Sequence, residues 1–446
     1  MVSGRGSKEF DVDSVVSGLD VDELRTIVLT AAEEHEDVAR SVRMAADRGS
    51  GDLAELRSEV DRGLRTRRYL GYWDSSAWAH EADPIIKALR DRAWSTPSLE
   101  LLGLIERAVG HMTKVILRAD DSNGSIGRRI GDLLDLHAQL CDAGVADPRK
   151  LARWMIRYGF EDQDFFAIDP VRYAAALGDK GLAVYRAEVE DRLERGDGSF
   201  HVQVAQERIA VLDGDIEAIV RLLGGDLSGP YHFIRVAKAM QELGRDDEVL
   251  AWAERGIEET TGWQVGRLYD LAAEVYASRG HLAERLALRR QQHVRMPSTR
   301  TYGLLRDAAE PTGSWSSEQG AARSLLAPGD LVDVLLGDGE PSAAWQVRID
   351  NPAWDPGADR LMRLAEAREP QHPEDALATY LQLAGLALET ADRAAYERAA
   401  AILKRARTAA QADGQSEAFH SHVADLRERY RRRPTLIKIL DRARLS

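Results

Sequence analysis

The side chains with the clearest potential chemistry lie near the C-terminal end of the chain. Five arginines crowd around one tyrosine there: Arg427, Arg429, Tyr430, Arg431, Arg432 and Arg433. Guanidinium groups bind phosphates and carboxylates, and an aromatic ring can stack on a base. The alternative is a helix C-terminus that carries cations because the helix dipole favours them, ended by Pro434. The sequence leaves both interpretations open.

The charge balance of the chain confines the phosphate-binding interpretation to the region near the C-terminal end. The 446 residues include 74 Asp and Glu against 60 Lys and Arg, so the net charge is −14. A chain with this balance repels phosphate backbones as a whole, which disfavours a general role in binding nucleic acid. Residues 401–446 differ, because they hold eleven Lys and Arg and only five Asp and Glu, a local charge of +6.

The motifs of the common catalytic and metal sites are absent from the sequence. There is no GxxxxGK[ST], no HExxH and no GxSxG. The run from His80 to Asp83 resembles the start of a metal phosphohydrolase helix, but no further ligands are evident. His420 and His422 are two positions apart, so on a helix they point in different directions and cannot share a metal. We therefore expect no catalytic residue, no metal and no cofactor, although an enzyme with an unfamiliar site stays an alternative.

The number of cysteines and the hydropathy of the chain indicate the cellular compartment of the protein. Cys141 is the one cysteine, so neither an intramolecular disulfide nor a cysteine-based zinc cage can form. Cys141 and His137 both fall on an apolar helical stripe, where we expect a plain core cysteine and a hydrogen-bonded core histidine. Residues 1–12 read as a disordered leader without the apolar stretch of a signal peptide. No window is long and apolar enough for a membrane span, and a cytoplasmic location is expected.

The elements that must position any functional side chain are predicted from a repeat. Residues 231–260 and 264–295 each contain an aromatic-rich helix, a glycine break and a second helix. The two breaks, Gly244 and Gly280, are 36 residues apart, which is the period of stacked two-helix repeats. Glycine adopts the left-handed turn between two helices without steric strain.

The apolar positions of the repeat have helical spacing and predict its core. In the first hairpin these positions are Phe233, Val236, Ala237, Met240, Val249, Ala253 and Ile257. In the second they are Leu268, Leu271, Ala272, Val275, Leu282, Leu286 and His293. Each set occupies one face of its two helices, so that stacked neighbours bury a continuous interior.

Helical patterns separated by Gly and Pro breaks cover nearly all of the chain, and no run alternates like a strand for more than a few residues. We predict an all-α fold, an α-solenoid of antiparallel helical hairpins of the tetratricopeptide-like kind. The expected organisation is a leader at 1–12, an irregular helical domain at 13–200 and a tetratricopeptide-like repeat domain at 201–446.

Several stretches resemble the helical part of bacterial SWIM zinc-finger family proteins. They are Asp147–Phe160, Asp169–Leu193, Leu250–Glu259, Leu268–Trp315, Pro373–Arg407 and Phe419–Asp441. In that family a Cys-x-Cys and Cys-x-His zinc module precedes the helices. Only Cys141 exists here, so the module is absent and its binding role does not carry over. The resemblance implies a tetratricopeptide-like scaffold, either without a zinc module or with one supplied by a separate chain.

The repeat predicts a non-enzymatic scaffold that binds a protein partner in a groove. On tetratricopeptide geometry the first helices of the hairpins line that groove, with candidate contacts at Arg235, Gln241, Arg267, Asp270 and Glu274. The alternative function is a nucleic-acid-associated regulator that uses the arginines around Tyr430. The oligomeric state and the partner are not readable from these patterns.

Overall fold

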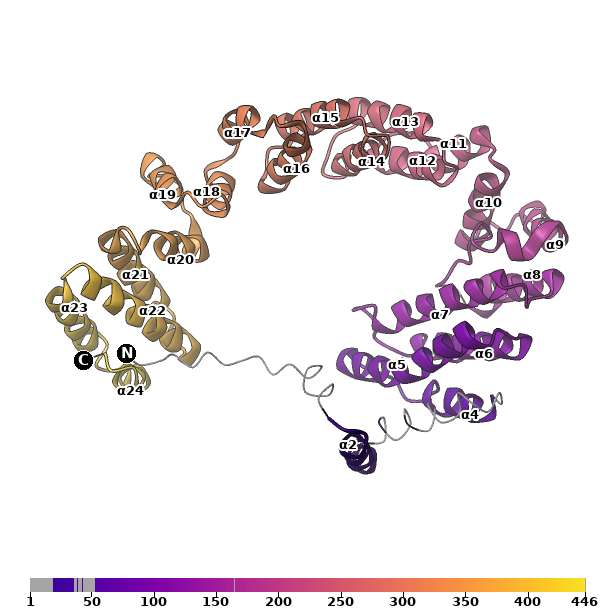
Figure 1. The fold of residues 1–446 in the computed structure, drawn as a ribbon, viewed down its shortest axis with the longest axis horizontal. Helices are drawn as coiled ribbons and strands as arrows, with labels where there is room; N and C mark the ends of the chain where they lie inside the picture. Colours follow the sequence, from indigo (N-terminus) through magenta and orange to yellow (C-terminus); the bar gives the residue numbers. More distant parts are fainter. Residues whose placement is uncertain (1–18, 36–37, 39–41, 43–52, 164, 446) are drawn as a thin grey trace. The chain divides into compact units, whose positions relative to one another are not determined.

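The computed structural model describes residues 19–35, 38, 42, 53–163 and 165–445. The predicted leader at 1–12 lies outside these residues. The described chain is helical and forms no strand, apart from one isolated bridge between Leu70 and Ala119. The predicted all-α class is confirmed (Figure 1). None of the helices described combines the length and the hydropathy that crossing a bilayer requires.

Contacts between residues divide the chain into two units, Met1–Leu223 and Gly224–Ser446. We call them unit 1 and unit 2. This division does not test the predicted boundary at residues 200 and 201, which concerned the onset of the repeats and stays a prediction.

The helices of unit 1 pack around one continuous apolar core. Their bounds are α2 Val21–Glu34, α4 Ala54–Gly63, α5 Tyr72–Ser95, α6 Leu99–Ile116, α7 Ser125–Asp142, α8 Pro148–Arg157, the π-helical turn η1 Tyr158–Asp162, α9 Ala174–Glu194, α10 Phe200–Asp213 and α11 Ile216–Gly224. The core extends from Leu53, just before α4, to Ala205 on α10. It includes no residue of α11, and none of the α2 side chains is buried in it.

The two candidate polar residues of this core behave as predicted. His137 is fully buried, its Nδ1 lies 3.0 Å from the Tyr173 hydroxyl, and its ring stacks on Trp154 with centroids 4.0 Å apart. Cys141 is 1% exposed, and burial raises the pKa of its thiol to about 12. A thiol that stays protonated at neutral pH is a poor nucleophile, so Cys141 is a packing residue.

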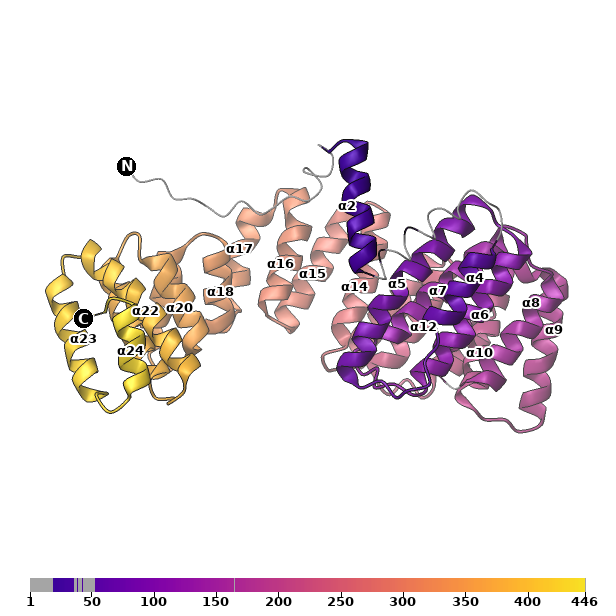
Figure 2. The same cartoon turned by 90° about the horizontal axis from the view of Figure 1, so that it is seen from below.

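Unit 2 is a succession of helical hairpins (Figure 2). Its helices are α12 Pro230–Glu242, α13 Asp246–Glu259, α14 Val265–Ser278, α15 Leu282–Arg295, α16 Thr299–Ala309, the 3₁₀ turn η2 Glu310–Thr312, α17 Trp315–Ser324, α18 Pro328–Gly337, α19 Pro341–Asp350, α20 Gly357–Arg368, α21 Pro373–Ala387, α22 Arg393–Ala412, α23 Ser416–Arg429 and α24 Pro434–Arg442. Most helices contact the next one along the chain, and α12 also contacts α14, α16 contacts α18 and α18 contacts α20, so that successive first helices lie side by side.

The apolar interior of unit 2 follows the order of the chain. One cluster joins Leu286 to Val334, a second joins Val332 to Leu364, and a third joins Ala365 to Leu445. Each cluster is built from helices that are neighbours in sequence, as expected where every repeat buries its apolar face against the next one. The predicted solenoid of antiparallel hairpins is therefore the architecture of this unit.

Both predicted glycine breaks terminate their helices in the same way. Gly244 and Gly280 have φ of 67° and 70°, in the left-handed region. The amide of the following residue donates to the carbonyl five positions earlier, at 2.9 Å after Gly244 and 2.8 Å after Gly280. This is the Schellman arrangement, which satisfies helix-end carbonyls and turns the chain into the second helix.

The predicted core of the two hairpins is buried at every position except one. Leu282 keeps 38% of its surface exposed, so its assignment to the core was wrong. It is the first residue of α15, and the buried residues of that helix begin one turn later at Leu286. Where α13 crosses its neighbours the contact is very close: a Cβ on Gly256 would lie 2.7 Å from Leu268 Cδ1 and 2.7 Å from Phe233 Cβ.

Candidate binding groove

A pocket of about 530 Å³ opens on unit 2 between α12, α14 and α15. We call it the groove. Its lining residues are Lys238, Arg267, Asp270, Leu271, Ala273, Glu274, Ala277, Arg285 and Arg289. The helical spacing on α14 places Arg267, Asp270, Glu274 and Ala277 on one face, since they are three or four residues apart. That face is turned away from the core positions Leu268, Ala272 and Val275.

Both acidic side chains of the groove are held by other groups of the chain. Asp270 accepts hydrogen bonds from Arg289 Nη1 at 2.7 Å and from Arg300 Nη2 at 2.8 Å. Glu274 accepts one from Gln241 Nε2 at 3.1 Å. The negative charge of Asp270 is thus neutralised inside the protein and is not offered to a ligand.

Three cations of the groove have no such partner. Lys238 and Arg267 are exposed and Arg285 is half-buried, and no ion pair joins any of them to another described residue. The groove therefore presents an excess of positive charge, although unit 2 belongs to a chain with a net charge of −14. Anionic groups are the ligands that such a surface attracts.

Exposed aromatic rings lie beside arginines of two successive first helices, Tyr231 at the start of α12 and Trp263 in the turn before α14. Arg235 lies over the ring of Tyr231 at 5.5 Å, and Arg267 lies over the ring of Trp263 at 5.8 Å. Tyr231 is 54% exposed and Trp263 74% exposed. In each pair the arginine follows the aromatic residue by four positions, so both hairpins present an arginine on the first helix beside an aromatic ring at or just before the start of that helix. A ring next to a guanidinium is a typical feature of protein-binding surfaces, where Tyr, Trp and Arg are enriched.

The structure brings together most of the partner-binding residues predicted from sequence. Arg267, Asp270 and Glu274 line the groove, and Gln241 reaches it through its hydrogen bond to Glu274. Arg235 is not among the lining residues and lies instead beside Tyr231. Whether any of the five contacts a partner stays a prediction.

Three cationic residues of the groove were missed by sequence reasoning. Lys238 follows Arg235 by three positions on α12, and Arg285 and Arg289 are four apart on α15. Lys238 lies on a first helix, where its spacing from Arg235 could have indicated it. Arg285 and Arg289 lie on a second helix, outside the first helices that tetratricopeptide geometry predicts to line a groove.

The C-terminal arginines are largely engaged within unit 2. Arg427 donates to Asp441 Oδ1 at 2.6 Å and to the Leu445 carbonyl at 3.0 Å, and Arg431 pairs with Glu428. The bond from Arg427 to Asp441 ties α23 to α24, whereas the Arg431 pair lies at the C-terminal end of α23.

Arg433 is half-buried, as Arg427 is, and contacts both backbone and aromatic rings. Its Nη1 donates to the Leu388 carbonyl at 2.7 Å, and its guanidinium lies 4.5 Å from the ring of Tyr430 and 5.9 Å from that of Tyr396. Tyr430 thus stacks on an arginine of its own chain. Arg429 and Arg432 are exposed and have no ion pair among the described residues, so the predicted role in nucleic-acid binding depends on these two.

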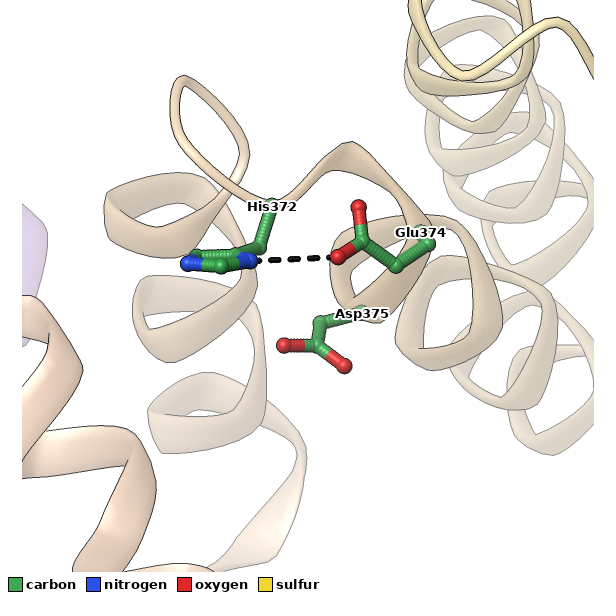
Figure 3. Close-up of side chains that lie close together, drawn as sticks. All are labelled: His372, Glu374 and Asp375. Carbon is green, nitrogen blue, oxygen red and sulfur yellow. Dashed lines mark hydrogen bonds and ion pairs between the residues drawn. The ribbon is translucent and has the colours of Figure 1, made fainter.

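One group of possible metal ligands lies at the start of α21. His372, Glu374 and Asp375 each place one ligand atom within 4.8 Å of the others, and His372 Nδ1 is 3.1 Å from Glu374 Oε1 (Figure 3). Arg368 Nε donates to Asp375 at 3.0 Å. A cation here would meet the Arg368 guanidinium and the positive end of α21, so the arrangement is better suited to the ion pairs it already makes.

The His80–Asp83 run does not form a metal site. His80 Nδ1 bonds to the Ser76 carbonyl on its own helix at 2.7 Å. Asp83 is paired with Arg129 at 2.7 Å. The two side chains are each engaged separately.

Comparison with known proteins finds matches among solved structures alone, at low identity and low TM-score. No protein-family model and no curated protein matches it, so the resemblance to SWIM zinc-finger proteins stays a prediction. Among solved structures, the pentatricopeptide repeat protein PPR10 from maize matches with 14% identity and a TM-score of 0.29, over 98% of this chain and 78% of that one. The human IFIT1 dimer with PPP-AAAA matches with 14% identity and a TM-score of 0.25, over 88% of this chain and 94% of that one. The APC/C hetero-tetramer Cut9-Hcn1 matches with 12% identity and a TM-score of 0.19, over 91% of this chain and 83% of that one.

Proposed function

We propose that this protein is a non-enzymatic helical-repeat scaffold that binds an acidic segment of a protein partner in the groove between α12, α14 and α15. One observation carries the proposal: Lys238, Arg267 and Arg285 face the groove without ion pairs among the described residues, while the acids beside them are satisfied. The proposal includes a cytoplasmic role and a relationship to the helical region of SWIM zinc-finger proteins.

The chemistry of the groove favours a peptide over a compact ligand. Its lining mixes charged groups with small apolar surfaces such as Leu271, Ala273 and Ala277. The exposed rings of Tyr231 and Trp263, at the N-terminal ends of the first helices, offer further apolar surface. An extended acidic segment with interspersed apolar side chains would contact both, with the carboxylates on the cations and the apolar groups on the rings.

The test compares partner capture by two charge-reversal variants and two matched controls. Lys238→Glu and Arg267→Glu reverse cations of the groove. Lys404→Glu and Arg398→Glu make the same changes on exposed residues of α22, which have no ion pair among the described residues. After nuclease treatment, quantitative mass spectrometry should show recovery of a specific acidic protein falling by about tenfold in the groove variants and staying constant in the controls.

Two outcomes would contradict the proposal. One is equal recovery of every protein by the groove variants and the wild type. The other is an equal loss in groove variants and controls, which would show that total charge and not the groove governs binding. Circular dichroism of each variant verifies that the helices are intact.

The alternative function is nucleic-acid binding at the C-terminal end. It is supported by the local charge of +6 over residues 401–446 and by the exposure of Arg429 and Arg432. It differs from the first proposal in its dependence on salt, because phosphate contacts release counterions and weaken steeply as salt concentration rises.

A further inference from the structure

A second pocket lies in unit 1, where α4 and α6 end. Its volume is about 440 Å³, within the range of small-ligand sites. Six of its lining residues are ionisable: Asp61, Arg65, Arg67, His111, Lys114 and Arg118. Neither the repeat nor the groove accounts for this pocket, which we call the cationic pocket.

Buried residues and backbone hydrogen bonds hold the walls of the cationic pocket. Arg65 and Arg67 lie on a short segment between Leu64 and Leu70. The side chains of these two leucines are fully buried. The Leu70 amide donates to the Arg118 carbonyl at 3.1 Å, and the Asp120 amide donates to the Leu70 carbonyl at 2.8 Å. The two arginine-bearing segments, about fifty residues apart in sequence, are thereby joined backbone to backbone. The exposed cations are therefore carried by two backbone segments that hydrogen bonds and buried side chains hold together.

Asp61 is the acidic residue of this lining, and its charge is already balanced. Arg107 donates to it from Nε at 2.5 Å and from Nη2 at 2.9 Å, and His111 Nε2 lies 2.9 Å from Oδ1. These hydrogen bonds lower the pKa of Asp61 to about 2, the one from Arg107 most strongly. Asp61 therefore stays ionised and paired with Arg107, and it does not neutralise the remaining cations.

Those remaining cations are four: Arg65, Arg67, Lys114 and Arg118. All four are exposed, and none has an ion pair among the described residues. The C-terminal ends of α4 and α6 attract cations, but each end amounts to about half a negative charge, so roughly three positive charges remain uncompensated. The whole chain has 14 more acidic than basic residues, so its composition does not account for this local excess of positive charge.

We propose that the cationic pocket binds phosphate groups. Guanidinium groups bind phosphate through two parallel hydrogen bonds, and an ammonium group adds a point charge. The pocket presents three guanidinium groups and one ammonium around a space larger than a single phosphate needs. A phosphorylated small molecule and the backbone of a nucleic acid share this chemistry, and the experiment separates them. The site lies in unit 1 and is independent of the groove in unit 2.

The probe is inorganic pyrophosphate, titrated calorimetrically into the full chain at low salt. The pocket variant is Arg67→Gln/Lys114→Gln, and its matched control is Arg90→Gln/Lys87→Gln on the exposed face of α5 in the same unit. We expect saturable binding that weakens about tenfold or more in the pocket variant and is unchanged in the control. Burial lowers the pKa of His111 in the free protein, and a bound anion should raise it, which NMR titration of its ring resolves.

A fluorescent single-stranded oligonucleotide forms the second arm. Oligonucleotide binding that pyrophosphate displaces and that the pocket variant loses assigns the site to a nucleic-acid backbone. Pyrophosphate binding without oligonucleotide binding assigns it to a phosphorylated small molecule. The proposal is overturned if neither probe binds at low salt, or if the control variant loses as much affinity as the pocket variant.

Discussion

Arg289 Nη1 lies 2.7 Å from Asp270 Oδ1, and this pair connects α15 to α14 at the base of the groove. The Arg289 side chain is 7% exposed and that of Asp270 is 35% exposed. A buried guanidinium needs its counterion, because an unpaired charge away from water is strongly unfavourable. Asp270, which the sequence suggested as a partner contact, thus has a structural role.

The first prediction follows from this pair. Replacing Asp270 by Ala leaves Arg289 without its counterion and should lower the free energy of unfolding by about 2 to 3 kcal/mol, less than for a fully enclosed pair because Asp270 is partly in water. Urea denaturation measures the change. Glu258→Ala, an exposed acid without an ion pair among the described residues, should have almost no effect. An equal effect of both changes would show that Asp270 does not stabilise the fold.

A second prediction concerns the crossing of α13 with its neighbours. Gly256→Ala puts a methyl group 2.7 Å from atoms of both Phe233 and Leu268, and should destabilise unit 2 by about 1 to 3 kcal/mol. Gly303→Ala on α16 is the control, since no heavy atom lies within 4 Å of the added Cβ. The control should be neutral or stabilising by about 0.5 to 1 kcal/mol, as alanine is the better helix former. Thermal unfolding of both variants checks the opposite signs.

The third prediction is a dependence of stability on pH at Asp61. Its pKa in the folded protein is about 2, below the ordinary 3.8, so its contribution to stability is fully present above pH 4. This contribution disappears as the pH falls from about 4 through 2, where the carboxylate is protonated. We expect Asp61→Asn to cost about 1 kcal/mol at pH 6, because both Asp61 and Arg107 are partly in water.

The measurement for Asp61 is the difference in unfolding free energy between wild type and variant across this range of pH. The difference should shrink towards pH 2. Asp74→Asn, an exposed aspartate on α5, should show a small and constant difference. A difference for Asp61→Asn that does not vary with pH would refute the assignment.

A fourth prediction separates two adjacent arginines. Arg433→Gln loses the hydrogen bond to the Leu388 carbonyl and the contact with the Tyr430 ring, so it should destabilise unit 2 by about 1 to 2 kcal/mol. Arg432→Gln, one position earlier and exposed, should leave stability unchanged. Chemical denaturation of the two variants side by side is the test, and equal stabilities would contradict the structural role of Arg433.

The fifth prediction tests the alternative function at the same end of the chain. If nucleic acid binds there, Arg429→Gln/Arg432→Gln should reduce the slope of log affinity against log salt by about 1.4, since each arginine contributes about one phosphate contact and each contact on a single strand contributes about 0.7 to the slope. Fluorescence anisotropy with a single-stranded oligonucleotide measures the slope at several salt concentrations. The pocket variant Arg67→Gln/Lys114→Gln serves as the comparison. An unchanged slope in the Arg429 and Arg432 variant would remove the C-terminal site.

The hairpins of unit 2 were predictable because their determinants are local. Gly244 and Gly280 end their helices by a backbone conformation that glycine adopts without strain, and the spacing of residues such as Phe233, Val236 and Met240 defines one helix face within a few turns. The prediction for Leu282 was wrong, because helical periodicity shows on which face of a helix a residue lies. It does not show where along the helix the neighbouring helices begin to bury that face.

Tertiary structure alone decided which charged side chains form ion pairs and which do not. Asp270 is neutralised by Arg289 and Arg300 from two later helices, while Lys238 and Arg285 are left to face the groove. Arg67 and Arg118 meet in one pocket although some fifty residues separate them. Helical periodicity and turns depend on nearby residues, so the sequence by itself determined them. Ion pairing depends on which helices become neighbours, and the packing of the whole unit settles that.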